Sequence, residues 1–234
     1  MTEIHCSGLL IDMDGVLVDS TPAVARVWTR WAMKHGIDPL HAVQLAHGRP
    51  SLSSIEELLP HASSAAHQAE NCWMEQAEIE DVDDVVALPG TKELLAAIVP
   101  SQFAVVTSAT RALTEVRLRA AGLWPFTRNL VTASDIQHGK PDPEPYRKGA
   151  AALNLPPKSC LVIEDAASGA RSGKAAGSRV LAVRTTSRDQ DLLAAGADWI
   201  VNDCSSVRVI SNSATGQLTL ALPVKEQRRV PKMH

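Results

Sequence analysis

Short apolar segments alternate with helical segments over about half of this chain, and this alternation restricts the fold more than any other feature. From about residue 88 to residue 201, apolar runs such as FAVVTSAT, SCLVIEDA and RVLAVRT are separated by helical patterns such as RALTEVRLRAAG and ASGARSGKAAG. Short apolar strands that alternate with helices form parallel sheets that are covered on both faces. The pattern therefore predicts an α/β fold with a parallel sheet at its centre.

A wholly helical block interrupts this alternation after the first expected strand, which lies in GLLIDMDGVLVDS, residues 8–20. The segments TPAVARVWTRWAMKHG, PLHAVQLAHG, SLSSIEELLP and ASSAAHQAENCWMEQAEIE have helical spacing and no strand-like alternation. Ser20 or Thr21 can cap the first of these helices. We therefore interpret residues 1–20 and 87–234 as one α/β core and residues 21–86 as a helical domain inserted into it.

The end of the chain predicts a different element. Residues 207–222, VRVISNSATGQLTLAL, have the pattern of a closing β-hairpin around Thr215 and Gly216.

The composition excludes several classes of protein. The 234 residues are 45% hydrophobic and 21% charged, with a formal net charge of -3. The chain therefore lacks the surplus of basic residues that would indicate nucleic-acid binding. No apolar run reaches the ~18 residues of a membrane span, and MTEIHCSG lacks the pattern of a secretory signal. The four cysteines are scattered, without CxxC spacing. We expect a cytoplasmic protein that binds neither nucleic acid nor membranes.

Polar side chains follow the expected strands at the points where those strands end. Open parallel sheets bind ligands at the carboxyl ends of their strands, so residues far apart in sequence can meet there. The candidates are Asp12 and Asp14 after the first strand, Thr107 and Ser108 after the second, Glu164 and Asp165 after a later one, and Lys140 in the loop HGKPDPEPY. If the first strand continues to Asp14, both of its acids point into one small volume.

These residue types together indicate phosphoryl chemistry. Clustered carboxylates favour a hard divalent cation, and Mg²⁺ is the common choice. A cation, a lysine and hydroxyl donors suit a phosphoryl group, whose oxygens need charge neutralisation. One carboxylate can attack phosphorus, and a second can move protons.

Four segments carry a resemblance to a known family. DMDGVLVDS, VVTSAT, GKPDPEPY and IEDAASG resemble, in order, the four motifs of the haloacid dehalogenase superfamily. The helical block resembles the small cap of the subfamily that includes phosphoglycolate phosphatases and β-phosphoglucomutases. Segments such as HGRPSLSSIEELLP and AVRTTSRDQDLLAAGADWIV are similar to bacterial sugar phosphatases and to yeast-type glycerol-phosphate and 2-deoxyglucose-6-phosphate phosphatases. The resemblance implies a Rossmann-like core, a helical cap and the terminal hairpin.

The resemblance also implies roles for the candidate residues. Asp12 corresponds to the nucleophile, and Asp14 to the general acid and base. Thr107, Ser108 and Lys140 would hold the phosphoryl oxygens. The Mg²⁺ ligands would come from Asp12, the backbone carbonyl of Asp14 and Asp165, with Glu164 beside it. The implied activity is hydrolysis of a small phosphate monoester, a sugar or polyol phosphate, through an aspartyl-phosphate, and a monomer is sufficient for it.

Arg49 and His47 lie in a loop between two expected cap helices. An arginine suits recognition of phosphate or polyol oxygens, so both residues are candidate substrate contacts. A surface loop without a role is an equally good interpretation.

Other activities fit the sequence less well. A phosphosugar mutase of the β-phosphoglucomutase type carries a cap histidine five residues after the acid that matches Asp19, where this chain has Val24. Dehalogenases lack the acid that matches Asp14, and phosphonate-cleaving relatives need a cap lysine, for which only Lys34 is present in residues 21–86. A silent binding module would have lost a motif, and none is lost. Phosphoglycolate hydrolysis remains an alternative.

Overall fold

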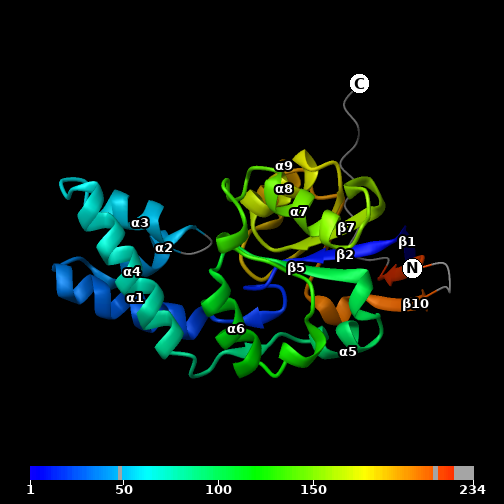
Figure 1. Cartoon of the computed structure of the whole chain (residues 1–234), viewed down its shortest axis with the longest axis horizontal. Coiled ribbons are helices and arrows are strands. Elements are labelled where there is room, and N and C mark those ends of the chain that lie inside the picture. The colour runs from blue at the N-terminus through cyan, green and yellow to red at the C-terminus, as the bar shows by residue number, and fades with distance from the viewer. Residues whose placement is uncertain (47–48, 213–215, 224–234) are drawn as a thin grey trace.

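A six-stranded parallel sheet forms the centre of the computed structural model, which describes residues 1–46, 49–212 and 216–223 (Figure 1). Its strand order is β6-β5-β2-β7-β8-β9, and all neighbouring strands are parallel. The strands are β2 (Gly8–Ile11), β5 (Phe103–Val106), β6 (Leu130–Val131), β7 (Cys160–Glu164), β8 (Arg179–Val183) and β9 (Trp199–Val201). The expected α/β fold is confirmed, and β2 lies between β5 and β7.

Helices cover both faces of this sheet. They are α5 (Thr91–Ala96), α6 (Arg111–Ala120), α7 (Glu144–Ala152), α8 (Ala167–Ala175) and α9 (Asp189–Ala194). Successive strand residues face opposite sides. Leu9 and Ile11 belong to one buried cluster with residues of α5 and α6, while Leu10 belongs to another with residues of α7, α8 and α9. In Figure 1, α7 to α9 accordingly lie on one side of the strands and α5 and α6 on the other.

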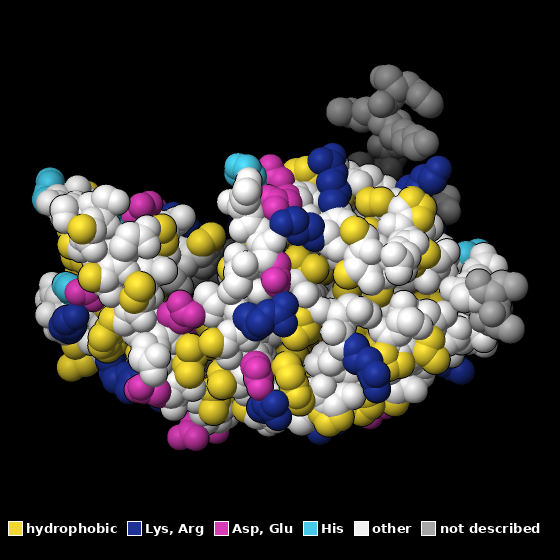
Figure 2. Space-filling view, viewed as in Figure 1, with side chains coloured by type: hydrophobic (Ala, Val, Ile, Leu, Met, Phe, Trp, Pro, Cys, Tyr) yellow, Lys and Arg dark blue, Asp and Glu magenta, His cyan; other side chains and the backbone are white. Residues whose placement is uncertain are grey.

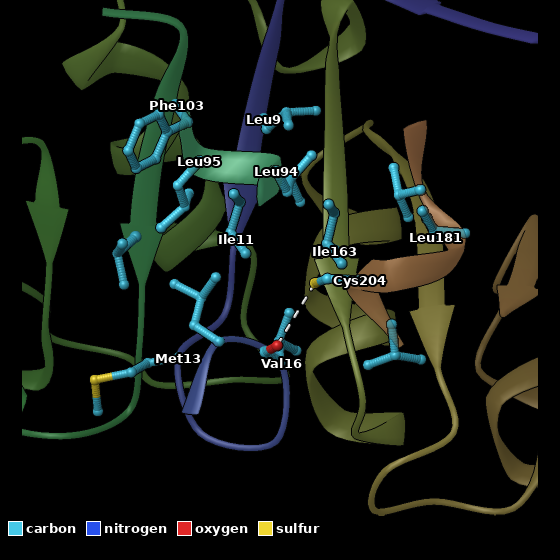
Figure 3. Packing of buried hydrophobic residues seen from close by; sticks show 14 of the residues in the cluster. Leu9, Ile11, Met13, Val16, Leu94, Leu95, Phe103, Ile163, Leu181 and Cys204 are labelled. Carbon is cyan, nitrogen blue, oxygen red and sulfur yellow. Dashed lines mark hydrogen bonds between the residues drawn. The ribbon is translucent and has the colours of Figure 1, made fainter. Parts of the chain in front are cut away.

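The packing beneath β2 also holds the loop that follows it. Figure 3 shows Met13 and Val16 in the same layer as Leu9 and Ile11, and all four side chains are buried. The thiol of Cys204 donates to the carbonyl oxygen of Val16 at 3.6 Å. Because the side chain of Met13 is fixed in the core, the backbone beside Asp12 has little freedom.

Four helices form a bundle beside the core, seen at the left of Figure 1. They are α1 (Thr21–His35), α2 (Pro39–Ala46), α3 (Ser51–Leu58) and α4 (Ser64–Glu80). The bundle has its own hydrophobic cluster, built around Trp28, Trp31 and Met74. Helix α1 ends at His35 and is followed by Gly36, whose left-handed backbone (φ 67°) suits glycine. Ser20 occupies the N-cap position, but its hydroxyl makes no capping bond, contrary to the sequence expectation.

Two short strands missed by the sequence analysis connect the bundle to the core. β3 (Val18–Asp19) and β4 (Val86–Ala87) pair antiparallel where the chain enters and leaves the bundle. A two-residue strand has no periodicity that could be recognised in the sequence.

The terminal hairpin is present as β10 (Arg208–Asn212) and β11 (Leu218–Leu222), which pair antiparallel. Thr215, at the expected turn, lies outside the described residues. A strand that was not predicted, β1 (Thr2–Cys6), pairs with β11 and completes a separate three-stranded sheet. Short 3₁₀ turns occur at Pro100–Gln102, Trp124–Phe126, Ala133–Asp135, Pro157–Ser159 and Cys204–Ser206. Within the described part of the chain, no helix combines the length and apolarity that crossing a bilayer requires.

Candidate active site

The candidate site lies where β2, β5 and β7 end next to one another. Asp12 directly follows β2, Thr107 directly follows β5, and Glu164 and Asp165 stand at the end of β7. Asp12 is 9% exposed, and the other three residues are at most 2% exposed. The sheet order thus brings together groups that are up to 153 positions apart in sequence, from Asp12 to Asp165.

Lys140 pairs with two acids of this group, Asp12 and Glu164. Its Nζ donates to Asp12 Oδ1 at 2.8 Å, to Glu164 Oε1 at 2.7 Å and to the carbonyl oxygen of Val106 at 3.1 Å. Burial alone would lower the pKa of Lys140, but the two carboxylates outweigh burial and raise it. Lys140 therefore remains a cation, although its side chain is only 6% exposed.

Glu164 has every acceptor position occupied. Its Oε1 accepts from Lys140 and from the hydroxyl of Tyr146 at 2.7 Å, and its Oε2 accepts from the backbone N–H groups of Asp165 and Ala166. Burial raises the pKa of Glu164, but Lys140 and these hydrogen bonds reverse the effect and leave it lowered. Glu164 is thus an ionised carboxylate that fixes the position of Lys140.

The negative charges of Asp12 and Asp165 are neutralised less completely by neighbouring groups. Burial raises the pKa of Asp12 to about 7, against the opposing charge of Lys140. Burial and the charges of Glu164 and Asp12 raise the pKa of Asp165 well above its usual value. Asp165 Oδ1 is buried and has no hydrogen-bond partner among the described residues. Gly15 approaches so closely that a Cβ there would lie 1.9 Å from Asp165 Oδ2.

This group of acids fits a divalent cation. One oxygen from each of Asp12, Glu164 and Asp165 lies within 4.8 Å of the others, and the ammonium of Lys140 pairs with only two of these three carboxylates, Asp12 and Glu164. Buried carboxylates need a cation or a proton, and hard divalent ions prefer oxygen ligands. The unpartnered oxygen of Asp165 is an available ligand atom.

Asp14 is oriented differently from the sequence expectation. Strand β2 ends at Ile11, so the strand alternation does not extend to Asp14 and the two acids do not share one volume by that rule. Asp14 Oδ1 accepts from the hydroxyl of Ser20 at 2.6 Å, and Asp14 Oδ2 pairs with Arg117 Nη1 at 3.0 Å. Its carboxylate lies at the boundary between the core and the bundle.

The remaining candidates occupy different environments. Thr107 is buried, and its hydroxyl oxygen accepts from the backbone N–H of Ala109 at 3.1 Å, while Ser108 is exposed. Arg49 lies on the bundle and pairs with Glu57 at 2.7 Å, with 38% of its side chain exposed. His47 lies outside the described residues.

Sequence reasoning missed Tyr146, Arg117 and Glu78. Tyr146 is the only tyrosine of the chain and follows Lys140 by six residues, which placed it near the site in sequence. Arg117 and Glu78 have ordinary places in amphipathic helices, α6 and α4, and nothing local distinguishes them from solvated charges.

Comparisons with known proteins identify a matching family and similar proteins. The family described as haloacid dehalogenase-like hydrolase matches residues 6–177. Hexitol phosphatase A of Escherichia coli is 39% identical over 77% of this chain and 84% of that protein. Glycerol-1-phosphate phosphohydrolase 2 of Saccharomyces cerevisiae is 31% identical over 88% of this chain and 86% of that protein.

A solved structure has a similar fold. A HAD hydrolase of family IA, variant 3, from Entamoeba histolytica covers 86% of this chain and 95% of its own, with a TM-score of 0.76 and 22% identity.

Proposed function

Because this chain belongs to the haloacid dehalogenase-like hydrolases, we propose that it hydrolyses a phosphate monoester of a sugar or polyol with Asp12 as the nucleophile. The observation that carries the proposal is the convergence of Asp12, Lys140, Glu164 and Asp165 in one buried group at the ends of β2 and β7. The relatives whose names specify polyol phosphates suggest the substrate class.

In the first step, a carboxylate oxygen of Asp12 attacks phosphorus, and the bond between phosphorus and the ester oxygen breaks. Asp14 gives a proton to the leaving alkoxide, and Lys140 neutralises charge on the phosphoryl oxygens. In the second step, Asp14 takes a proton from water, the water oxygen attacks phosphorus, and the bond to Asp12 breaks. The products are the free alcohol and inorganic phosphate.

Asp12, Asp165 and the backbone carbonyl of Asp14 would hold Mg²⁺, which supplies further neutralisation of the phosphoryl charge. Glu164 contributes indirectly, because its oxygens are occupied by Lys140, Tyr146 and two backbone donors. Thr107 and Ser108, at the end of β5, would donate to the phosphoryl group.

The bundle α1–α4 would act as a cap, with residues 21–86 as its limits. The molecular surface is hollowed between the bundle and the core (Figure 2), which leaves space for a substrate to enter. Arg49 and His47 stay proposed substrate contacts, and Arg49 would have to exchange its partner Glu57 for the substrate.

One position argues against the mutase. The position that would carry its cap histidine holds Val24, a partly buried side chain packed against the hydrophobic cluster of the bundle. The proposal includes a monomer. It also includes a reducing compartment such as the cytoplasm, since all four cysteines are free thiols and three are buried.

The test is a panel assay of released phosphate with hexitol phosphates, glycerol 1-phosphate, 2-deoxyglucose 6-phosphate, phosphoglycolate and β-glucose 1-phosphate. We expect turnover of sugar or polyol phosphates with Mg²⁺, loss of turnover with EDTA, and recovery when Mg²⁺ is restored. Asp12→Asn should abolish turnover and keep the fold, since it removes the nucleophile with little change in volume. Residual Mg²⁺-dependent turnover in that variant would contradict the nucleophile, and glucose 6-phosphate as a product would support the mutase instead.

A further inference from the structure

Arg117 bridges two carboxylates that come from different parts of the molecule. It lies on α6 of the core, and its Nη1 is 3.0 Å from Asp14 Oδ2. Its Nη2 donates to Glu78 Oε2, also at 3.0 Å, and Glu78 belongs to α4 of the bundle. The side chains of Arg117 and Glu78 are only 6% and 8% exposed. A planar guanidinium can hold two carboxylates in fixed directions at once.

The bundle contacts the start of α6 as well. The hydroxyl of Thr110, the residue before α6, donates to Glu75 Oε1 at 2.5 Å. Glu75 and Glu78 are three positions apart, so they lie on the same face of α4. Two polar contacts from one helix face therefore hold the bundle against α6.

The second oxygen of Asp14, Oδ1, is bound at the point where the chain enters the bundle. Ser20, which donates to Asp14 Oδ1, is the last residue before α1. Glu78 lies two residues before α4 ends. One oxygen of Asp14 is thus held directly by Ser20, beside the first connection between bundle and core. The other is linked through Arg117 to Glu78, near the second connection, so movement of the bundle must change the surroundings of this carboxylate.

We propose that Arg117 is a positioning residue that ties the direction of the Asp14 carboxylate to the position of the bundle through Glu78. The inference rests on the proposed function, in which Asp14 moves protons. When the bundle moves relative to α6, Glu78 moves with it while Arg117 stays on the core. The guanidinium then redistributes its hydrogen bonds between Glu78 and Asp14, and Asp14 turns toward or away from the substrate.

The test uses two esters that differ in their need for a proton donor. An alkyl phosphate such as glycerol 1-phosphate releases an alkoxide, which must be protonated, whereas p-nitrophenyl phosphate releases a stable anion. The ratio kcat/KM reports the steps up to release of the alcohol. Only the kcat/KM of the alkyl ester therefore depends on the orientation of the Asp14 carboxylate. We expect Arg117→Met to lower kcat/KM for the alkyl ester by about 100-fold. The loss with the aryl ester should stay within about threefold, because that step needs no acid.

Two further variants complete the comparison. Asp14→Asn sets the size of the effect when the acid itself is lost. Glu78→Gln should show the same bias toward loss with the alkyl ester, at smaller size, because it weakens the tie to the bundle and leaves Asp14 and Arg117 in place.

Arg119→Met is the matched control. Arg119 lies on the same helix, but its side chain is 55% exposed and pairs with Glu115. Its loss should therefore leave kcat/KM unchanged for both esters. Since Arg117→Met leaves Glu78 buried without its partner, the double variant Arg117→Met/Glu78→Gln repeats the test with that charge removed.

Equal losses with both esters, or no loss, would overturn the inference, because a purely structural ion pair does not distinguish leaving groups. A bias in Arg117→Met that is absent in Glu78→Gln would overturn the link to the bundle. Failure of the proposed function looks different: the wild-type protein would then hydrolyse neither ester in a manner that Asp12→Asn abolishes.

Discussion

Glu164 and Gly169 meet at the end of β7, where the first turn of α8 passes over the carboxylate. A Cβ on Gly169 would lie 1.6 Å from Glu164 Oε1, the oxygen that accepts from Lys140 and Tyr146. A glycine is required here by space, since the position has no left-handed backbone. The helix that closes over the site thus depends on the absence of one methyl group.

Gly169→Ala should consequently damage the site as well as the fold. The methyl group must displace Glu164, and Lys140 then loses the acceptor that fixes it. We expect the free energy of unfolding to fall by about 1–3 kcal/mol, the usual effect of overpacking. We expect kcat to fall by about tenfold or more, because Lys140 acts on developing charge. Urea unfolding and steady-state kinetics measure the two effects.

Gly173→Ala on the same helix is the control. Its Cβ would lie 3.0–3.1 Å from methyl groups of Val180 and Val162. Neither valine belongs to the candidate site. The Gly173→Ala variant should lower stability through overpacking as well, but leave kcat unaltered. If both variants lose kcat equally, the effect belongs to α8 in general and the role given to Glu164 is wrong.

The proximity of single residues could be predicted from the sequence where they follow a strand, but not where only tertiary contacts bring them together. Asp12, Glu164 and Asp165 follow apolar runs that read as strands, so sheet topology alone predicted that they meet. Arg117 reads as one of several surface charges on a helix, and only the return of the bundle onto α6 buries it. No local pattern carries that information.

Among the elements, the loop before α7 contributes Lys140 to the site. Glu144, the first residue of α7, accepts from the backbone N–H groups of Gln137 and His138 and pairs with Lys148 at 2.9 Å. These contacts lower the pKa of Glu144 to about 2, with Lys148 the largest cause and the two N–H groups next. The carboxylate thus closes the loop onto its own helix.

The stabilisation from Glu144 should depend on pH in a defined direction. Its folded pKa of about 2 lies below the unfolded value of about 4.3, so the stabilisation is complete above about pH 4.3. It is lost as the pH falls through that value toward 2. Glu144→Gln should therefore be less stable than the wild-type protein at pH 7, and the difference should shrink between pH 4.5 and pH 2.5.

Urea unfolding of both proteins at several pH values measures this difference. A gap that stays constant across the acid range would mean that the charge of Glu144 does not hold the loop.

The elements themselves follow the sequence closely in the α/β region, and the misses share a cause. Each strand from β5 to β9 was expected because its apolar run lies beside a helix with clear caps or periodicity. Strand β1 pairs with β11, and Thr2 lies opposite Leu222. Because the two strands are at opposite ends of the sequence, no local pattern could predict their pairing. β3 and β4 are two residues each, and their pairing exists only because the bundle brings the chain back.

At the scale of the whole molecule, the bundle and the core are two packing units with few shared apolar contacts. The hydrophobic cluster of the bundle draws all its residues from α1 to α4 and the segments between them, and those of the sheet draw none from α2 or α3. Polar contacts at Glu75 and Glu78, together with the β3–β4 pair, join the two units. Such a junction permits the bundle to open or move while the sheet stays intact.

Weakening the cluster of the bundle should therefore release the bundle alone. Ile55 on α3 is fully buried, and Ile55→Ala removes apolar contacts at a typical loss of about 2–5 kcal/mol. If the bundle opens as a local unit, amide hydrogen exchange in α1–α4 should accelerate by at least about 30-fold, the equivalent of 2 kcal/mol. Exchange of the amides in β2, β5 and β7 should stay as slow as in the wild-type protein.

Leu161→Ala, in the centre of the sheet, is the control and should accelerate the slowest amides of the core. Uniform acceleration in Ile55→Ala would instead mean that the bundle and the sheet unfold as a single cooperative unit.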